Sequence, residues 1–213
     1  MSNIWRFVML QGIYAISDEI LTPYQEIFAM LQKAIEGGIS IFQFRDKSHQ
    51  DNQIESLVAE LMDYCEQEQI LFVLNDRIEL AMKLQTKGLH IGKKQEVHPY
   101  SLEELYMIRK SYGGILGISC YGDLQLAQNA KEIGADYIAF GSCFASPTKT
   151  QAKVISLDLF QKIQGIKKCA IGGINQQNIH QLQNVDMVAC ISSIWKGDII
   201  KNIDNLKRNW KNL

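Results

Sequence analysis

Residues 39–45 read ISIFQFR, residues 70–75 read ILFVLN and residues 88–92 read GLHIG. Each run is short and apolar and is followed by a segment of helical period, which is typical of a strand buried on both faces. The same alternation continues in both directions along the chain. Five further runs, at 7–17, 115–119, 135–141, 168–173 and 187–193, bring the number of predicted strands to eight.

Amphipathic segments separate these runs, for example 24–36 and 53–66, where apolar residues recur at helical spacing. The others are 77–86, 101–112, 123–133, 156–165, 175–184 and 198–211. Strict alternation predicts an α/β fold with a parallel sheet, and eight units in 213 residues favour a closed (β/α)8 TIM barrel over a doubly wound open sheet. Three prolines and no linker or low-complexity tract predict a single domain over 1–213.

The composition excludes several classes of partner. The net charge is −1 and no block of five like charges occurs, so neither a nucleic-acid tail nor a polybasic membrane patch is expected. No apolar run approaches the roughly 18 residues of a membrane span, and the start MSNIWRFVML lacks the pattern of a signal peptide. Five dispersed cysteines without a C-x-x-C pair fit a reducing compartment, so we expect a soluble, cytoplasmic protein.

A barrel of this class places its active site at the C-terminal ends of its strands. The second run ends in Gln43, Arg45 and Lys47, which the strand period of two aims to one face. Two cations and an amide suit a polyanion such as a phosphate ester. The alternative is that Arg45 and Lys47 pair with Asp46 or Asp76 in a structural ion network.

Asn75 and Asp76 end the third run and combine an amide with a carboxylate, which suits a divalent metal held together with substrate phosphates. The alternative is that they cap the helix that follows. His90, inside the apolar GLHIG run, is interpreted as a packed and hydrogen-bonded lumen residue rather than a catalytic base.

Three later segments are candidates for holding phosphate. A loop after the sixth run contains a rigid proline flanked by Ser146, Thr148 and Lys149. The alternative is a surface turn, in which the same residue types also occur. Gly172 and Gly173 end the seventh run, and 191–193, ISS, ends the eighth, where barrels often bind phosphate with backbone N–H groups. The alternative for the glycines is a tight turn that needs them only for its dihedral angles.

In this order, the pieces closely resemble the thiamine-phosphate synthase family, whose members join the pyrimidine and thiazole halves of thiamine. The resemblance runs from about Tyr14 to Ile194 through YAISD, GGISIFQFRDK, NDR, GLHIG, GIS, GADYIAFG, SPTK, IGGI and ISSI. No single piece is decisive, whereas the ordered set is specific.

The resemblance implies a role for each matching residue. Gln43, Arg45, Lys47 and Asn75 match residues that hold the pyrimidine diphosphate, Asp76 matches a Mg²⁺ ligand, and Ser119 matches a hydroxyl that touches the pyrimidine. Lys149 matches a lysine that reaches the diphosphate, so the catalytic set is Arg45, Lys47, Lys149 and Ser119. The thiazole phosphate is expected at Ser146, Thr148, Gly173, Ile191 and Ser192.

The chain departs from the family pattern at the second Mg²⁺ ligand, where Gln95 replaces an aspartate. Glu96 could substitute after a shift of one residue, or Lys93 or Lys94 could supply charge instead. The usual Thr-His after the fifth strand's serine is also changed, to Cys120-Tyr121. These changes bear on metal dependence and efficiency more than on the fold.

The resemblance implies a Mg²⁺-dependent transferase whose partners are two small molecules, and it leaves a homo-oligomer open. Two rival functions are a thiazole tautomerase-like isomerase and a non-catalytic binder of thiamine precursors. The tautomerases used for comparison carry a histidine in the loop after strand six, and here 142–150 contains none.

Overall fold

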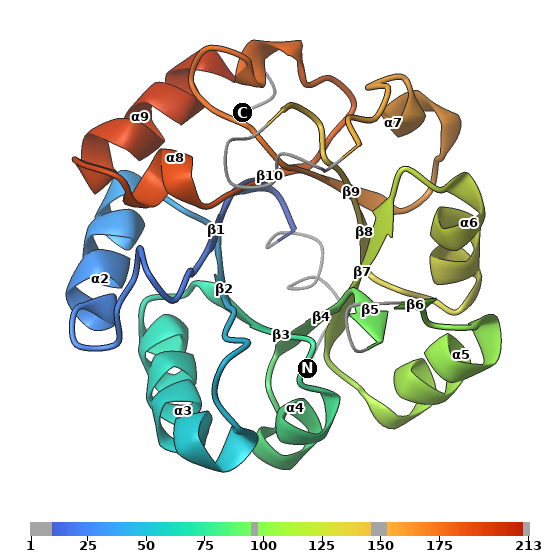
Figure 1. The fold of residues 1–213 in the computed structure, drawn as a ribbon, viewed down its shortest axis with the longest axis horizontal. Helices are drawn as coiled ribbons and strands as arrows, with labels where there is room; N and C mark the ends of the chain where they lie inside the picture. The colour runs from blue at the N-terminus through green and yellow to red at the C-terminus, as the bar shows by residue number, and fades with distance from the viewer. Residues whose placement is uncertain (1–9, 95–97, 146–152, 211–213) are drawn as a thin grey trace.

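Eight parallel strands close into a barrel (Figure 1). The computed structural model describes residues 10–94, 98–145 and 153–210. The closing pair is β1 with β10, in which Tyr14 lies opposite Ala189. The barrel strands are β1 (Gly12–Ile16), β2 (Ile41–Phe44), β3 (Leu71–Asn75), β4 (Gly88–Ile91), β7 (Ile115–Tyr121), β8 (Tyr137–Phe140), β9 (Lys167–Ile171) and β10 (Met187–Cys190). The predicted TIM barrel is therefore confirmed, and the open sheet is wrong.

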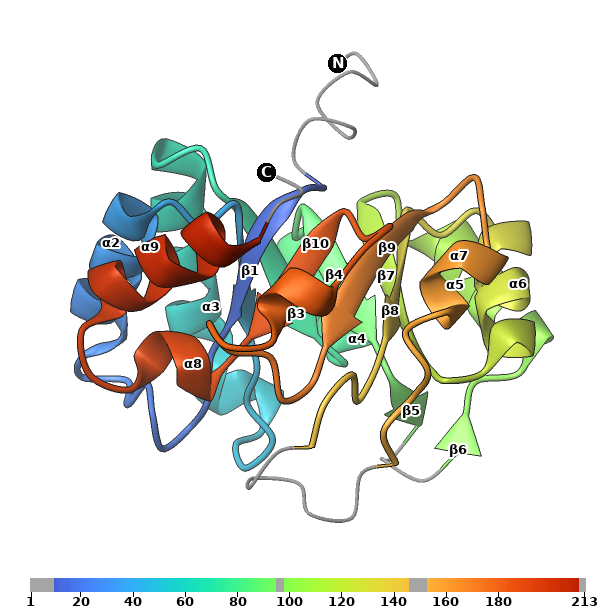
Figure 2. The ribbon, with the colours of Figure 1, turned by 90° about the horizontal axis from the view of Figure 1, so that it is seen from above.

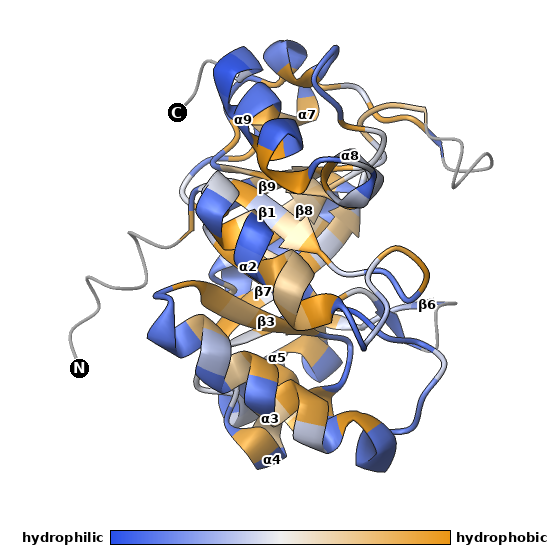
Figure 3. Ribbon diagram, turned by 90° about the vertical axis from the view of Figure 1, so that its left-hand side faces the viewer, coloured by the Kyte–Doolittle hydropathy of each residue, from blue (hydrophilic) through white to orange (hydrophobic). Residues whose placement is uncertain are grey.

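Helices surround the barrel and turn their apolar faces toward the strands (Figures 1 and 3). They are α2 (Ile27–Gly37), α3 (Asp51–Gln67), α4 (Ile78–Leu84), α5 (Leu102–Ser111), α6 (Leu124–Glu132), α7 (Leu159–Lys162), α8 (Ser192–Trp195) and α9 (Ile199–Asn209). Polar side chains cap three of them: Ser101 accepts from Glu104 N, Asp123 from Leu126 N and Asp198 from Lys201 N. Within the described residues, no helix has both the length and the apolar character that a membrane crossing requires.

Two of the predicted helices are much shorter than the sequence pattern indicates. Of 156–165 only α7 is helical, and of 175–184 only a 3-10 turn, Ile179–Gln181, forms. Asparagine side chains explain the second case, because Asn178 Oδ1 accepts from Asn175 N and Asn178 Nδ2 donates to Gly173 O. Such side-chain bonds compete with the backbone bonds of a helix. The sequence also gave no sign of the small hairpin of β5 (Lys93–Lys94) and β6 (His98–Pro99).

The core has two parts. The larger part lies between strands and helices, and the smaller fills the lumen of the barrel. Tyr14 and Tyr137 lie in the lumen with 1% and 0% exposure. Tyr137 passes so close to β7 that a Cβ at Gly117 would lie 2.0 Å from its Cζ atom. Glycine in the middle of β7 therefore makes room for an aromatic ring, which positions the site described below.

Candidate active site

The predicted polar residues gather at the C-terminal ends of β2, β3 and β7. Figure 2 shows the β5–β6 hairpin at this end of the barrel. Gln43 is buried on β2, Arg45 follows that strand directly, and Asn75 is the last residue of β3. Ser119 is half-buried on β7. Because β2, β3, β4 and β7 are consecutive in the barrel, these side chains share one rim.

Asp76 follows β3 and holds the most constrained carboxylate of this rim. Its Oδ1 accepts from Gly92 N at 2.7 Å and its Oδ2 accepts from Asn75 Nδ2 at 2.8 Å. Its backbone is left-handed, with φ of 59°, a conformation that few residues other than glycine adopt. The N-cap of α4 is Arg77, without a side-chain capping bond, so neither Asn75 nor Asp76 has the capping role considered as the alternative.

Arg45 is anchored by its backbone while its charged group is left available. Arg45 N donates to Ser17 Oγ at 2.8 Å. The guanidinium forms no ion pair or hydrogen bond with another residue that the structure describes. Lys47, two residues further along, is exposed, and its backbone N donates to Glu19 Oε1 at 2.6 Å. The structural-network alternative therefore does not account for Arg45.

Asp46, between these two cations, is instead a structural anchor. Its buried carboxylate accepts from Arg77 Nη2 at 2.8 Å, from His49 N at 2.9 Å and from the Tyr24 hydroxyl. Burial alone would raise the pKa of Asp46, but the hydrogen bonds from Tyr24 and His49 outweigh it and the pKa lies below its usual value. Arg77 also pairs with Asp51 and donates to His49 O at 2.7 Å. These contacts tie the loop after β2 to α3 and α4.

A chain of hydrogen bonds crosses the lumen below the rim. Gln43 Nε2 donates to Tyr14 Oη at 2.6 Å, and Tyr14 Oη lies 2.9 Å from Tyr137 Oη. The chain continues from Tyr137 Oη to His90 Nδ1 at 3.0 Å and from His90 Nε2 to Ser119 Oγ at 2.8 Å. Burial lowers the pKa of His90 to about 4, against an opposing effect of Asp76, so the ring is neutral near pH 7. His90 is therefore a hydrogen-bonded lumen residue, as predicted.

Tyr121 joins the rim at one of the positions where the chain departs from the family pattern. A Cβ at Gly92 would lie 3.2 Å from Tyr121 Oη, 3.6 Å from Asp76 Oδ1 and 3.8 Å from Ser119 Oγ, so these groups converge on one point. Burial and Asp76 together raise the pKa of Tyr121 to about 12. Lys93 Nζ lies 5.0 Å from the centre of the Tyr121 ring, a cation–π contact.

The loop after β9 is packed closely against the loop after β8. Gly172 and Gly173 have φ of 98° and 65°, and a Cβ on Gly173 would lie 2.4 Å from Phe144 O. Both the dihedral angle and the close approach of another backbone thus require glycine there. Ile191 precedes α8, which begins at Ser192. The backbone N–H groups of Gly173 and Ser192 donate to no other described residue.

Five predicted site residues lie outside the described residues. They are Gln95 and its rival Glu96, together with Ser146, Thr148 and Lys149. Of the two other lysines considered as sources of charge, Lys94 pairs with Glu104 at 2.6 Å.

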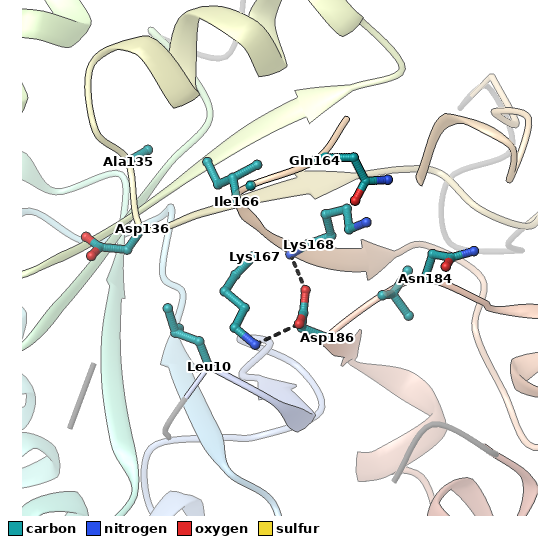
Figure 4. A pocket seen from close by; sticks show the side chains of 11 residues that line it. Leu10, Ala135, Asp136, Gln164, Ile166, Lys167, Lys168, Asn184 and Asp186 are labelled. Atoms are coloured by element: carbon teal, nitrogen blue, oxygen red, sulfur yellow. Dashed lines mark hydrogen bonds and ion pairs between the residues drawn. The ribbon is translucent and has the colours of Figure 1, made fainter. Parts of the chain in front are cut away.

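A hollow of about 740 Å³ lies at the opposite end of the barrel, where the strands begin (Figure 4). The charged groups that line it have partners: Lys167 Nζ lies 2.8 Å from Asp186 Oδ1, Lys168 Nζ donates to Phe160 O at 2.8 Å, and Asp136 pairs with Arg109. We therefore place the chemistry at the other rim, where Arg45 and Asp76 carry charge without an ion-pair partner among the described residues.

Comparison with known proteins identifies the family of the chain. Residues 13–194 match the model of a family described as thiamine monophosphate synthase. The chain is 44% identical over 210 residues to the thiamine-phosphate synthase of Wolinella succinogenes, with 95% of each chain covered. It is 38% identical over 185 residues to that of Alcanivorax borkumensis, covering 84% of this chain and 82% of the relative.

The chain belongs to the thiamine monophosphate synthase family. A solved structure of thiamine phosphate pyrophosphorylase from Pyrococcus furiosus superposes with a TM-score of 0.81 at 27% identity, covering 95% of this chain and 96% of that one.

Members of the thiamine monophosphate synthase family are expected to use Mg²⁺, and the donor set at this rim fits that ion. Asp76 presents a carboxylate whose oxygens each accept only one hydrogen bond from the described residues, and Asn75 Oδ1 is left over when its Nδ2 donates to Asp76. Mg²⁺ takes hard oxygen ligands, usually one or two carboxylates completed by water and substrate phosphates.

Two members of the lumen chain, Tyr14 and Tyr137, were not identified from the sequence of this synthase-family protein. Both lie inside apolar runs, where tyrosine is indistinguishable from a packing residue. A signal was present nevertheless, because Gly117 interrupts the fifth strand at the place that the Tyr137 ring occupies.

Proposed function

We propose that this family member joins hydroxymethylpyrimidine diphosphate to thiazole phosphate, giving thiamine phosphate and pyrophosphate. The bond from the pyrimidine methylene carbon to the diphosphate oxygen breaks, and its electron pair leaves with pyrophosphate. The thiazole nitrogen then donates its lone pair to the methylene cation, forming the new carbon–nitrogen bond. No protein nucleophile is needed, so catalysis consists of binding, alignment and charge neutralisation.

The observation that carries this proposal is that two charged side chains of the rim are not neutralised by an ion pair. Arg45 and Asp76 lie at the ends of adjacent strands, and neither has an ion-pair partner among the described residues. An arginine fork suits phosphate oxygens, and a carboxylate beside it suits a divalent cation that binds the same phosphates. A diphosphate with its metal would complete both groups at once.

The remaining roles follow from the match to the family. Arg45, Lys47 and Lys149 neutralise the leaving pyrophosphate, and Gln43, Asn75 and Ser119 hold the pyrimidine. The thiazole phosphate binds to Ser146, Thr148, Gly173, Ile191 and Ser192, and its binding energy aligns the nitrogen with the methylene carbon. Asp76 and Gln95 would hold Mg²⁺, which would add positive charge beside the leaving group.

The family match and the relatives support the synthase over the two rival functions. The chain also lacks, over 142–150, the histidine that a tautomerase would carry in this loop. We further place the protein in the cytoplasm, a proposal supported by its five cysteines, which are all free thiols and buried.

An assay with both purified substrates, with and without Mg²⁺, tests the proposal. We expect thiamine phosphate and pyrophosphate in equal amounts, only when both substrates are present. Arg45→Ala should lower turnover at least tenfold (~1.4 kcal/mol) without lowering the melting temperature. The control Arg208→Ala, which removes a 75% exposed side chain on α9, should not change turnover. Conversion of thiazole phosphate alone, or binding of both substrates without product, would overturn the proposal.

A further inference from the structure

The lumen chain contains more polar groups than packing requires. It runs from Gln43 through Tyr14, Tyr137 and His90 to Ser119, and so joins side chains of five strands. Barrel interiors are usually filled by branched aliphatic residues, and two phenylalanines would fill nearly the same space as the two tyrosines. Buried hydroxyls destabilise a fold unless they are hydrogen-bonded. Here all of them are bonded, to one another and to two residues of the proposed site.

The order of donors along this chain is fixed by its first member. The Gln43 amide nitrogen can only donate, so Tyr14 Oη accepts from it, and Tyr137 Oη is the one other described group placed to take the Tyr14 proton. Tyr137 in turn donates to His90 Nδ1. A neutral histidine that accepts at Nδ1 carries its proton on Nε2, and this proton is donated to Ser119 Oγ.

The two ends of the chain therefore have opposite hydrogen-bonding character. With its nitrogen committed to Tyr14, Gln43 has its carbonyl oxygen Oε1 left to accept, and this atom bonds to no other described residue. Ser119 Oγ accepts from His90, so its own proton is left to donate. An aminopyrimidine ring has the complementary pattern, since its exocyclic amine donates and its ring nitrogens accept.

We propose that the chain through Tyr14, Tyr137 and His90 is a positioning device that makes Gln43 an acceptor and Ser119 a donor toward the aminopyrimidine ring. The pyrimidine part of this inference rests on the proposed function. Tyr14 and Tyr137 are positioning residues, because they act through Gln43 and Ser119 without belonging to the rim. The close approach of the Tyr137 ring to Gly117 supports this inference, since any side chain at Gly117 would displace the ring.

The decisive variant is Tyr14→Phe, which changes no atom in contact with His90. If Gln43 determines which atom of each hydrogen bond in the chain is the donor, this variant removes that constraint. His90 then changes from the Nε2–H tautomer to a mixture of both tautomers. Long-range nitrogen–proton NMR spectra distinguish the two tautomers, and the His90 signals among the four histidines are assigned by their loss in His90→Gln. The KM for the pyrimidine diphosphate should rise ~tenfold, the effect of one good hydrogen bond, with the KM for thiazole phosphate unchanged.

Two further variants keep the test decisive. Tyr137→Phe should give the same two changes, and the double variant should add little to either single one, because the chain acts as a unit. Tyr112→Phe is the control: it removes another buried hydroxyl, which donates to Thr86 O at 2.7 Å outside the lumen chain, and should change stability only.

Retention of a single Nε2–H tautomer and of the wild-type KM in both Tyr14→Phe and Tyr137→Phe would overturn the inference, as would an Nδ1–H tautomer in the wild type. A wild type without synthase activity would instead contradict the proposed function, and the tautomer measurement would still decide whether Gln43 directs the chain.

Discussion

At the end of the barrel where the strands begin, Asp136 and Asp186 each accept a hydrogen bond from a backbone N–H and form an ion pair with a cationic side chain. Asp136 accepts from Leu116 N at 2.9 Å and pairs with Arg109, and Asp186 accepts from Lys168 N at 2.9 Å and pairs with Lys167. At the end where the strands finish, Asp76 also accepts a backbone N–H, that of Gly92. Its second partner is the neutral amide of Asn75.

This difference separates a structural aspartate from one that is available for chemistry. The backbone bond is common to all three carboxylates and fixes each against a neighbouring strand. Only Asp76 completes its coordination with an amide that carries no charge, so its negative charge is not neutralised by any described residue. A cationic ligand or a metal bound to phosphate would supply that neutralisation.

Removing the charge of one aspartate at each end of the barrel should have the largest effect and tests this difference directly. Asp76→Asn should lower turnover ~100- to 1,000-fold, the usual effect of removing one group that stabilises developing charge, with little change in the melting temperature. Asp186→Asn should do the reverse, keeping turnover and lowering the free energy of unfolding by about 1–2 kcal/mol. Turnover and thermal unfolding of both variants decide the matter. A loss of stability rather than activity in Asp76→Asn would mean that Asp76 is structural as well.

Asp46 provides a second test, because it lies at the rim of the proposed site but forms an ion pair, as the aspartates at the other end of the barrel do. Asp46→Ala should lower the free energy of unfolding by about 3 kcal/mol, since it leaves the guanidinium of Arg77 with a poorer set of partners. The matched variant is Asp51→Ala, which removes the other, 43% exposed carboxylate from the same arginine and should cost under ~1 kcal/mol. Equal losses in urea unfolding would contradict the role assigned to Asp46.

The lowered pKa of Asp46 gives that anchor a characteristic pH dependence. A carboxyl group whose pKa is lower in the folded state stabilises the fold above its unfolded pKa of 3.8, and this contribution disappears as the pH falls through the folded value. The difference in unfolding free energy between wild type and Asp46→Asn should therefore be constant near neutral pH and shrink in acid. Urea titrations from pH 6 to pH 3 measure it, and a difference independent of pH would show that the charge of Asp46 is not involved.

The smallest effect is expected at Gln95, outside the described residues. Because a glutamine oxygen carries no net charge, Gln95→Asp should lower the Mg²⁺ concentration for half-maximal turnover about threefold by giving the rim a second carboxylate. Mg²⁺ titrations of this variant and of Glu96→Ala distinguish the two candidates for the second ligand. A large loss of metal affinity in Glu96→Ala, without a response in Gln95→Asp, would favour Glu96.

The strands were predictable because an apolar run consists of consecutive residues and can be identified without knowing any distant contact. Each of the eight runs overlaps a barrel strand, and their order indicated the rim on which Gln43, Arg45, Asn75 and Asp76 meet. The apolar period over 175–184 predicted a helix that does not form, because Asn175 and Asn178 direct their hydrogen bonds to a turn.

The partners of individual polar groups were not predictable, since they depend on the closed barrel. Tyr14 and Tyr137 are 123 positions apart and meet only across the lumen. Asp46 and Arg77 are 31 positions apart, and the sequence offered Arg45 and Lys47 as nearer cations for Asp46. Spacing in the sequence therefore indicated which residues form the rim, but not which of their charges are already neutralised.

The pairing of β1 with β10 has a consequence for biosynthesis. Tyr14 is translated long before its strand partner Ala189, because the other seven barrel strands begin between them in the sequence. At ~5–20 residues per second, a ribosome needs ~10–35 s to make the intervening polypeptide. During that interval β1 has an unpaired edge and the Tyr14 hydroxyl is still hydrated. The nascent chain should therefore be most prone to aggregation, and most dependent on chaperones, until the last strand emerges.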